Sequence, residues 1–422
     1  MYINFLGEIT RLTLRMETKL LEDSRDLFED IEIEGAKLRL FVDEFGKTDI
    51  AVTKDGKALK SIPAKIKKDD KVKALLETKR KFTEQYRRTR LMFEQAMEDC
   101  TTFTAKELTL LEDNPIVFPI IKTLLFMVDE SGKLGFIREG KLYDYEGNET
   151  SLKEDELLRV AHSFNIYKDG HWSDYQKYVF DNGIVQPFKQ IFRELYVKTS
   201  EELEMTDTRR YSGNQIQPKK TIACLKGRRW VPDIENGIQK VYYKENIVAT
   251  IYAMADWFSP ADIEAPTLEW VSFMDRKTWK PIKIKDIPDI IFSEIMRDVD
   301  LAVSVAHAGG VDPETSHSTI EMRAALVEFT LPLFKLTNVT VEKSHAFIKG
   351  KYGEYSVHLG SGVVHKMGGT MINILPVHSQ HRGKVFLPFA DEDPKTAEII
   401  TKVLFLSEDS KIKDPSILEQ IK

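Results

Sequence analysis

A glycine-rich stretch near the end of the chain carries the residues whose types best suit ligand binding. Between Phe347 and Val377, apolar residues alternate as in strands and are interrupted by glycines. Glycine inside a strand marks a bulge, a tight corner or the close approach of another group. We therefore predict that Gly350, Gly360 and Gly362 line a concave surface near Arg193 or Glu321. His358 and Ser361 would present polar groups there to a small anionic molecule or a partner segment. The alternative is a turn packed against a helix of the protein itself.

A second candidate lies between Gln186 and Tyr196, which the spacing of apolar residues predicts to be a helix beginning at Pro187. Its opposite face presents Lys189, Gln190, Arg193 and Glu194. Because Lys189 and Arg193 are one turn apart, they could hold a phosphate or carboxylate between them. The alternative is a solvated face with an internal ion pair.

Two further clusters of charged residues lie before and at the start of the helix that the sequence predicts from Thr319. Asp298 and Asp300 would share one face of a strand and could hold a magnesium ion, or they could cap and pair with Arg297. Glu321 and Arg323 stand at the start of a helix, where an acidic residue complements the helix dipole. We include both residues among the candidate ligand contacts.

The histidines do not form a recognisable catalytic or metal site. Seven of the nine follow residue 306, including the pair His378 and His381. No cysteine joins them, and no carboxylate stands at a recognised ligand spacing, so we predict no metal site. Ser356 and His358 would share a strand face without a visible carboxylate partner, which leaves nucleophilic catalysis unsupported. The sequence names no cofactor.

Charge and cysteine content limit the partners and the compartment. The net charge is −6, and the two cysteines form neither a disulfide framework nor a zinc site, which suits a reducing cytoplasm. Twelve basic and four acidic residues lie between Lys60 and Arg90. They could pair internally with an acidic patch from Glu22 to Glu34 or form a plain solvated face, so we expect nucleic-acid binding to be weak at most. No segment is long and apolar enough to span a membrane.

The pattern of periodicities predicts an α+β protein with a helix and β-meander N-terminal domain and a mixed α/β central and C-terminal body. Helical spacing marks residues 2–30 and 70–100, and two similar meanders with acidic-Gly-Lys turns lie on either side of the second helix. Aspartate followed by proline at 393–394 and 414–415 predicts two helix starts. We place domain limits at 1–150, 151–310 and 311–422, with the last segment packed on the central domain.

Several runs resemble the bacterial MolR-like domain family, which often accompanies WGR modules. The residues concerned include Gly170-His171-Trp172, Gln186 through Gln190, Arg297 through Asp300, and Tyr355 through Gly362. The similarity covers about residues 150–422. It implies a cytoplasmic bacterial protein that is a short family member or the C-terminal part of a larger one. The family supplies no established reaction, and a WGR module is absent here.

Two hypotheses for function follow. The first is a non-catalytic module of a regulatory or stress-response system, since no complete catalytic set is visible. The second is an enzyme acting on a nucleotide or another phosphorylated ligand through Lys189, Arg193 and the glycine-rich strands. The second hypothesis requires these segments to converge in space.

Overall fold

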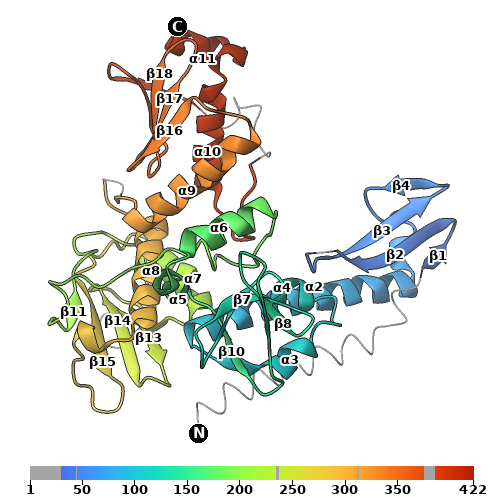
Figure 1. The fold of residues 1–422 in the computed structure, drawn as a ribbon, viewed down its shortest axis with the longest axis horizontal. Helices are drawn as coiled ribbons and strands as arrows, with labels where there is room; N and C mark the ends of the chain where they lie inside the picture. The colour runs from blue at the N-terminus through green and yellow to red at the C-terminus, as the bar shows by residue number, and fades with distance from the viewer. Residues whose placement is uncertain (1–29, 44, 234–236, 311–312, 375–384) are drawn as a thin grey trace. The chain divides into compact units, whose positions relative to one another are not determined.

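The computed structural model describes residues 30–43, 45–233, 237–310, 313–374 and 385–422 (Figure 1). Its helices accompany four antiparallel sheets, which confirms the predicted α+β class. The chain divides into two compact units. The first holds residues 1–175 and 184–191, and the second holds residues 176–183 and 192–422.

The first unit begins with a four-stranded sheet on a long helix. Its strands alternate inward apolar and outward polar residues, so that Leu38, Leu40 and Val52 meet Val72 and Phe82 of the helix in one core. Asp69 caps the helix by accepting a hydrogen bond from the amide of Lys71. The elements are β1 (Ile31–Ile33), β2 (Ala36–Val42), β3 (Thr48–Lys54), β4 (Lys57–Leu59), the 3-10 turn η2 (Ile66–Lys68) and α2 (Asp70–Glu98).

The second half of α2 packs on a six-stranded sheet with the order β5-β10-β6-β7-β8-β9. Meanders therefore precede and follow the long helix, as predicted, with turns at Gly132 and Gly140 in the second one. The strands are β5 (Thr102–Thr104), β6 (Leu125–Val128), β7 (Leu134–Arg138), β8 (Lys141–Tyr143), β9 (Glu149–Ser151) and β10 (Leu157–Val160). The helices are α3 (Ala105–Thr109), α4 (Phe118–Ile121), α5 (Ser163–Asp169) and α6 (Trp172–Asp181), whose last turns belong to the second unit.

The second unit contains a five-stranded sheet covered by the apolar face of α8. The strand order is β11-β15-β14-β13-β12, and Ile295, Val299 and Val303 of α8 pack against Ile251 and Phe273 of the sheet in one core. The elements are β11 (Asp207–Thr208), α7 (Pro218–Leu225), the 3-10 turn η3 (Lys226–Arg228), β12 (Val231–Asp233), β13 (Gly237–Tyr242), β14 (Ile247–Tyr252), β15 (Trp270–Asp275), the 3-10 turn η4 (Ile284–Asp286) and α8 (Asp289–Ala306).

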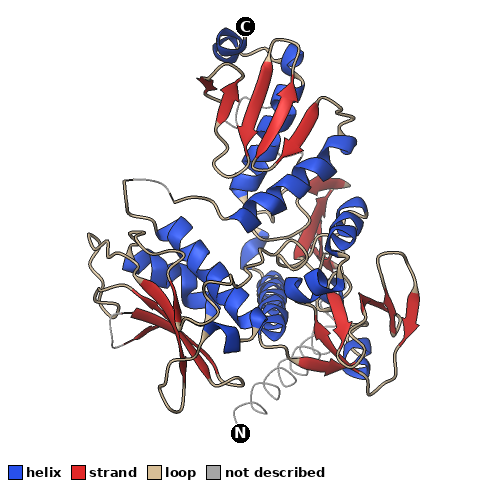
Figure 2. Ribbon diagram, turned by 60° about the vertical axis from the view of Figure 1, so that its left-hand side comes forward, coloured by secondary structure: helices blue, strands red, loops and turns tan. Residues whose placement is uncertain are grey.

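The glycine-rich region forms another five-stranded sheet, a meander whose strands follow the order of the sequence, and α10 packs across one of its faces (Figure 2). Both predicted helix starts are confirmed, since Asp393 and Asp414 cap helices that begin at proline. The elements are α9 (His317–Leu333), β16 (Val339–Glu342), β17 (His345–Lys349), β18 (Glu354–His358), β19 (Val364–Lys366), β20 (Thr370–Ile372), α10 (Pro394–Ser407), the 3-10 turn η6 (Asp409–Lys411) and α11 (Pro415–Ile421).

Some predictions fall where the structure gives no description. The expected helices in residues 2–30, most of the acidic patch, and the pair His378 and His381 lie outside the described residues. The domain limits at 150 and 310 stay predictions, and the division into compact units falls within residues 175–192. Within the described ranges, none of the helices combines the length and apolar content needed to cross a lipid bilayer.

Candidate functional site

The segment expected to be a helix from Pro187 to Tyr196 is not helical, so that prediction is wrong. Its backbone amides bond to side chains instead of to carbonyls one turn earlier. The amide of Ile191 donates to Gln186 Oε1, that of Leu195 to Ser318 Oγ, and that of Tyr196 to Ser293 Oγ. Lys189, Gln190, Arg193 and Glu194 are all buried, so the expected solvated face does not exist.

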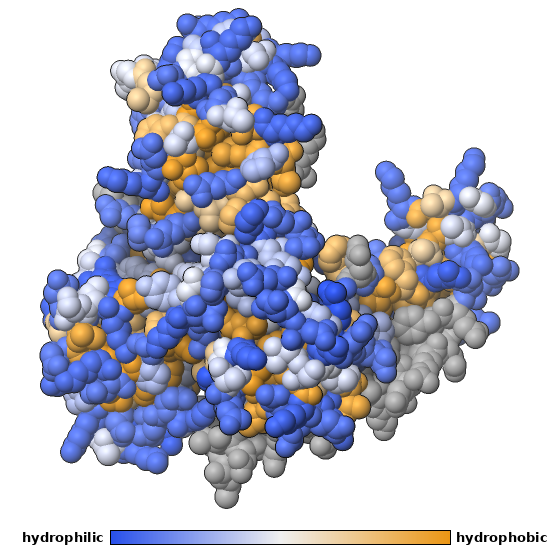
Figure 3. Space-filling view, viewed as in Figure 1, coloured by the Kyte–Doolittle hydropathy of each residue, from blue (hydrophilic) through white to orange (hydrophobic). Residues whose placement is uncertain are grey.

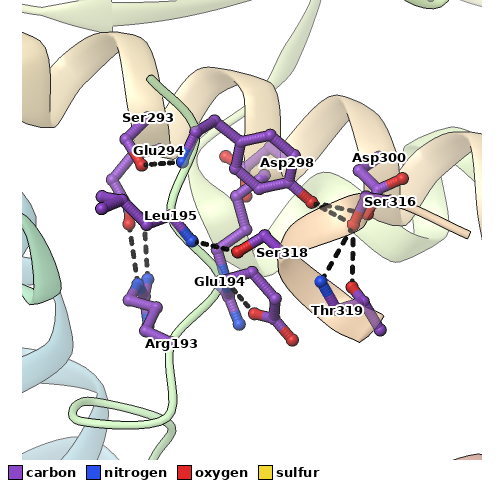
Figure 4. A network of polar contacts seen from close by, with 12 residues as sticks. Arg193, Glu194, Leu195, Ser293, Glu294, Asp298, Asp300, Ser316, Ser318 and Thr319 are labelled. Atoms are coloured by element: carbon purple, nitrogen blue, oxygen red, sulfur yellow. Dashed lines mark hydrogen bonds and ion pairs between the residues drawn. The ribbon is translucent and has the colours of Figure 1, made fainter. Parts of the chain in front are cut away.

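From Arg193 onward the segment lies against α8, which it crosses in Figure 4. Arg193 meets Glu294, whereas Lys198 reaches the carbonyl of Ile287 before the helix begins. The guanidinium of Arg193 donates from Nε and Nη2 to the two oxygens of Glu294, each at 2.7 Å. Both side chains are fully buried. A two-point pair of this kind satisfies buried charges that would otherwise be very costly.

The next pair of the segment lies further along α8. Glu194 accepts a hydrogen bond of 2.8 Å from Nε of Arg297, and both residues are buried. The hypothesis that Arg297 pairs with Asp298 or Asp300 is therefore wrong, because its carboxylate partner comes from outside the helix. The proposed strand face for the two aspartates is also wrong, because residues two apart on an α-helix point in different directions.

Asp298 lies at the centre of a buried cluster of three donors. Lys240 Nζ and Trp230 Nε1 approach its Oδ2 at 2.9 and 2.8 Å, and Arg228 Nη1 approaches Oδ1 at 2.9 Å. Burial alone would raise the pKa of Asp298, but Lys240 and Arg228 outweigh it and hold the pKa below its ordinary value. The carboxylate thus ties β13 and the segment before β12 to α8.

Asp300 connects the same helix to the start of α9. The Tyr196 hydroxyl donates to Asp300 Oδ2 at 2.6 Å and lies 3.1 Å from Ser316 Oγ, while Ser316 caps α9 at Thr319 (Figure 4). Burial raises the pKa of Asp300, although the hydrogen bonds from Tyr196 and Ser316 oppose this. We call the set formed by Arg193, Glu194, Tyr196, Glu294, Arg297, Asp298 and Asp300 with their partners the α8 network.

Arg323 extends this pattern to the glycine-rich strands. It is buried on α9, donates from Nη1 to the carbonyls of Leu359 and Gly360 at 2.9 and 2.7 Å, and donates from Nε to Thr396 at 3.0 Å. Glu321, two residues earlier, is exposed and pairs with His317 at 3.1 Å. Of the two candidate residues on this helix, Glu321 therefore faces solvent, whereas Arg323 is buried and binds the backbone of the turn between β18 and β19.

That turn is filled by the protein's own side chains. Ser361 contacts Nδ1 of His358 through its hydroxyl at 2.9 Å and its amide at 3.0 Å. A Cβ atom at Gly360 would stand 2.8 Å from His358 Cε1. Gly362 has a φ of +72°, and its carbonyl accepts from Lys402 at 2.8 Å. The geometry matches the alternative of a turn packed on helices.

Gly350 does not join the other two glycines. It lies in the turn between β17 and β18, at the opposite end of β18 from Gly360. A Cβ atom there would come within 2.3 Å of Asp409, whose carboxylate accepts from Lys351, Tyr352 and Tyr355. The single concave surface expected from all three glycines is therefore wrong.

Gln190 has a structural role within the first unit. Its amide accepts from the backbone of Leu125 at 2.9 Å, donates to the carbonyls of Leu125 and Ala161 at 2.7 and 2.8 Å, and accepts from Gln186. This glutamine joins residues 184–191 to the start of β6. Lys189, the preceding residue, is also buried.

Sequence reasoning missed two members of the α8 network that had a visible signal. Lys240 occupies an inward position of β13 between Ile238 and Tyr242, where a charge needs a buried partner. Glu294 interrupts the apolar face of α8 in the same way. Neither signal identifies the partner, which comes from a distant part of the chain. Among the described residues, no group of three or more histidine, cysteine, aspartate or glutamate side chains could hold a metal ion.

Comparison with known proteins adds two matches without a named activity. Residues 56–230 match the family model of a domain of unknown function (DUF4132), and residues 320–421 match that of another domain of unknown function (DUF7737). No curated protein and no solved structure gave a significant match. The first match includes Arg193, and the second includes Arg323 and the glycine-rich strands. The MolR-like resemblance stays a prediction.

Proposed function

We propose that this chain is a non-catalytic module of a regulatory or stress-response system in the bacterial cytoplasm. One observation supports this proposal most directly: the polar residues that could have formed a ligand site are engaged within the protein. Arg193 is fully paired with Glu294, and the turn at Gly360 is occupied by Arg323, His358 and Lys402. The resemblance to the MolR-like family is the reason for naming a bacterial cytoplasmic setting, and the regulatory role rests on the lack of a complete catalytic set in the sequence.

The same observation removes the argument for an enzyme of phosphorylated ligands. That hypothesis needed the positive charge of Arg193 to face a ligand beside the glycine-rich strands. The Arg193 guanidinium is fully buried and donates from Nε and Nη2 to a buried carboxylate, so its charge is paired and does not face a phosphate in solution. His358 and Ser361 still form a hydrogen-bonded pair, so they are the residues through which the enzyme hypothesis can be tested.

The test is a search for turnover with a built-in control. The purified chain is incubated with a mixture of nucleotides and sugar phosphates, and the phosphorus NMR spectrum is followed over time. The proposal expects spectra identical to those without protein. Turnover that disappears in both the His358→Ala and the Ser361→Ala variants, each checked for folding by circular dichroism, would overturn it. Turnover that survives both substitutions would also overturn it and would place the chemistry elsewhere.

A further inference from the structure

The corner of the first unit formed by the β3–β4 hairpin, η2 and the first turn of α2 carries a concentration of positive charge. Residues 54–71 contain seven lysines and three aspartates in a chain whose net charge is −6. All seven lysines are exposed. Figure 3 shows hydrophilic side chains projecting where β3 and β4 lie in Figure 1. We call this set the lysine corner: Lys54, Lys57, Lys60, Lys65, Lys67, Lys68 and Lys71.

The lysine corner differs from the following part of α2, where several basic residues have carboxylate partners. Lys73 pairs with Asp70, Lys79 with Asp49, and Arg87 with Glu84, at 2.6 to 2.8 Å. In the ranges that the structure describes, by contrast, none of the seven corner lysines has a carboxylate within ion-pair distance. The nearby Asp69 is already used as the cap of α2. Ion pairing among the described residues therefore does not explain this charge.

Two placements in the corner work against folding. Lys54 and Lys57 are directly opposite each other in the hairpin register, where like charges repel. Lys67, Lys68 and Lys71 surround the N-terminal end of α2, where the helix dipole disfavours cations. Both arrangements become favourable when an anion with several charges lies over them.

The composition of the corner restricts which polyanion fits. Residues 54–71 contain no aromatic side chain, so bases of a single strand would find no ring to stack on. Only Leu59 is a large exposed apolar residue there, which is too little for insertion into a lipid surface. Lysine ammonium groups act as point charges toward phosphate and read no base sequence. We propose that the lysine corner binds the phosphate backbone of a nucleic-acid duplex without sequence preference. This inference stands independently of the proposed function.

The proposal is tested by fluorescence anisotropy with two labelled duplexes, one of DNA and one of RNA. Each duplex has about 20 base pairs, so that it offers more phosphates than the seven lysines can contact. If about five phosphates are contacted, the affinity should fall by about 10² to 10³ between 50 and 200 mM salt. The two duplexes distinguish the source of the shared backbone chemistry. If neither duplex binds at the lower salt concentration, the proposal is overturned. It is also overturned if phosphatidylserine vesicles bind the protein more tightly than the duplexes do.

Matched variants locate the contact. The quadruple variant Lys57→Gln, Lys60→Gln, Lys67→Gln, Lys68→Gln should weaken binding at least tenfold and reduce the salt slope by about 3 to 4. The control carries Lys73→Gln, Lys79→Gln, Lys81→Gln and Arg87→Gln, which remove the same charge from paired positions of α2. It should keep most of the affinity. Equal losses in the two variants would show a general charge effect and overturn the assignment to the corner. Thermal melting of both variants verifies that they are folded.

Discussion

The α8 network and the lysine corner show two opposite treatments of charge in one chain. In the network, carboxylates and cations are buried and matched in position, as with Arg193 and Glu294. In the corner, exposed lysines gather with little compensation. Buried charge must be paired for the protein to fold, whereas exposed like charge adds nothing to folding and is available to a partner. The number of polar residues in a region therefore says less about binding than their pairing does.

The largest expected effect comes from breaking a pair of the network. Arg193→Ala would leave Glu294 buried without its partner and should lower the free energy of unfolding by about 3–5 kcal/mol. Chemical denaturation followed by circular dichroism measures this. As a control, Arg87→Ala breaks an exposed pair with Glu84 and should cost at most about 0.5 kcal/mol.

A double variant sharpens the same prediction. Replacing both partners, with Arg193→Met and Glu294→Leu, should recover most of the stability because no unpaired charge remains. If the double variant were as unstable as Arg193→Ala alone, the loss would come from the altered packing of α8 and not from the charge. The contrast between the network and the corner would then lose its basis.

A smaller effect is expected from the pH dependence of Asp300. Burial raises its pKa in the folded protein above the unfolded value, so the fold favours the protonated form. The resulting stabilisation is complete below the unfolded pKa and is lost as pH rises through the folded pKa. Wild type should therefore lose stability relative to Asp300→Asn as the pH rises above the ordinary aspartate pKa of about 4 toward neutrality. Urea denaturation across that range checks the sign, and a difference that grows in favour of wild type with rising pH would contradict it.

The smallest effect on stability should come from the lysine corner. The variant with glutamine at positions 57, 60, 67 and 68 should change the free energy of unfolding by no more than about 0.5 kcal/mol, with a tendency toward stabilisation because Lys54 loses a repelling neighbour. The same denaturation experiment measures it. A large destabilisation would mean that these lysines support the fold, and the distinction between the two regions would fail.

The sequence was sufficient where local pattern and final environment agree. The stripe of α2, the meanders before and after it, and the aspartate caps at 393 and 414 were all predicted, because each depends on residues close in the chain. The same reasoning failed between Gln186 and Tyr196. There the apolar spacing matches a helix, but both the apolar and the polar side chains are buried, and backbone amides find side-chain partners such as Ser293 and Ser318.

The candidate site was less accessible to prediction for a related reason. The sequence identified Arg193 as a candidate ligand-binding cation, but its partner Glu294 is 101 residues away. The donor to the carbonyl of Gly360 is Arg323, which lies on α9. A single sequence shows which charges exist and not which ones meet. The parity argument for Asp298 and Asp300 also depended on a strand, and the change to a helix reversed its meaning.

The interleaving of the two compact units has a consequence for how the protein is made. The chain leaves the first unit after Tyr175, returns for residues 184–191, and then leaves again. During synthesis from the N-terminus, β6 and β10 leave the ribosome well before Gln190. The side-chain amide of Gln190 donates hydrogen bonds to the backbone carbonyls of Leu125 and Ala161. Until residue 191 had emerged, the nascent first unit would lack the hydrogen bonds of Gln190 to the start of β6, and translation would already have begun the second unit by then.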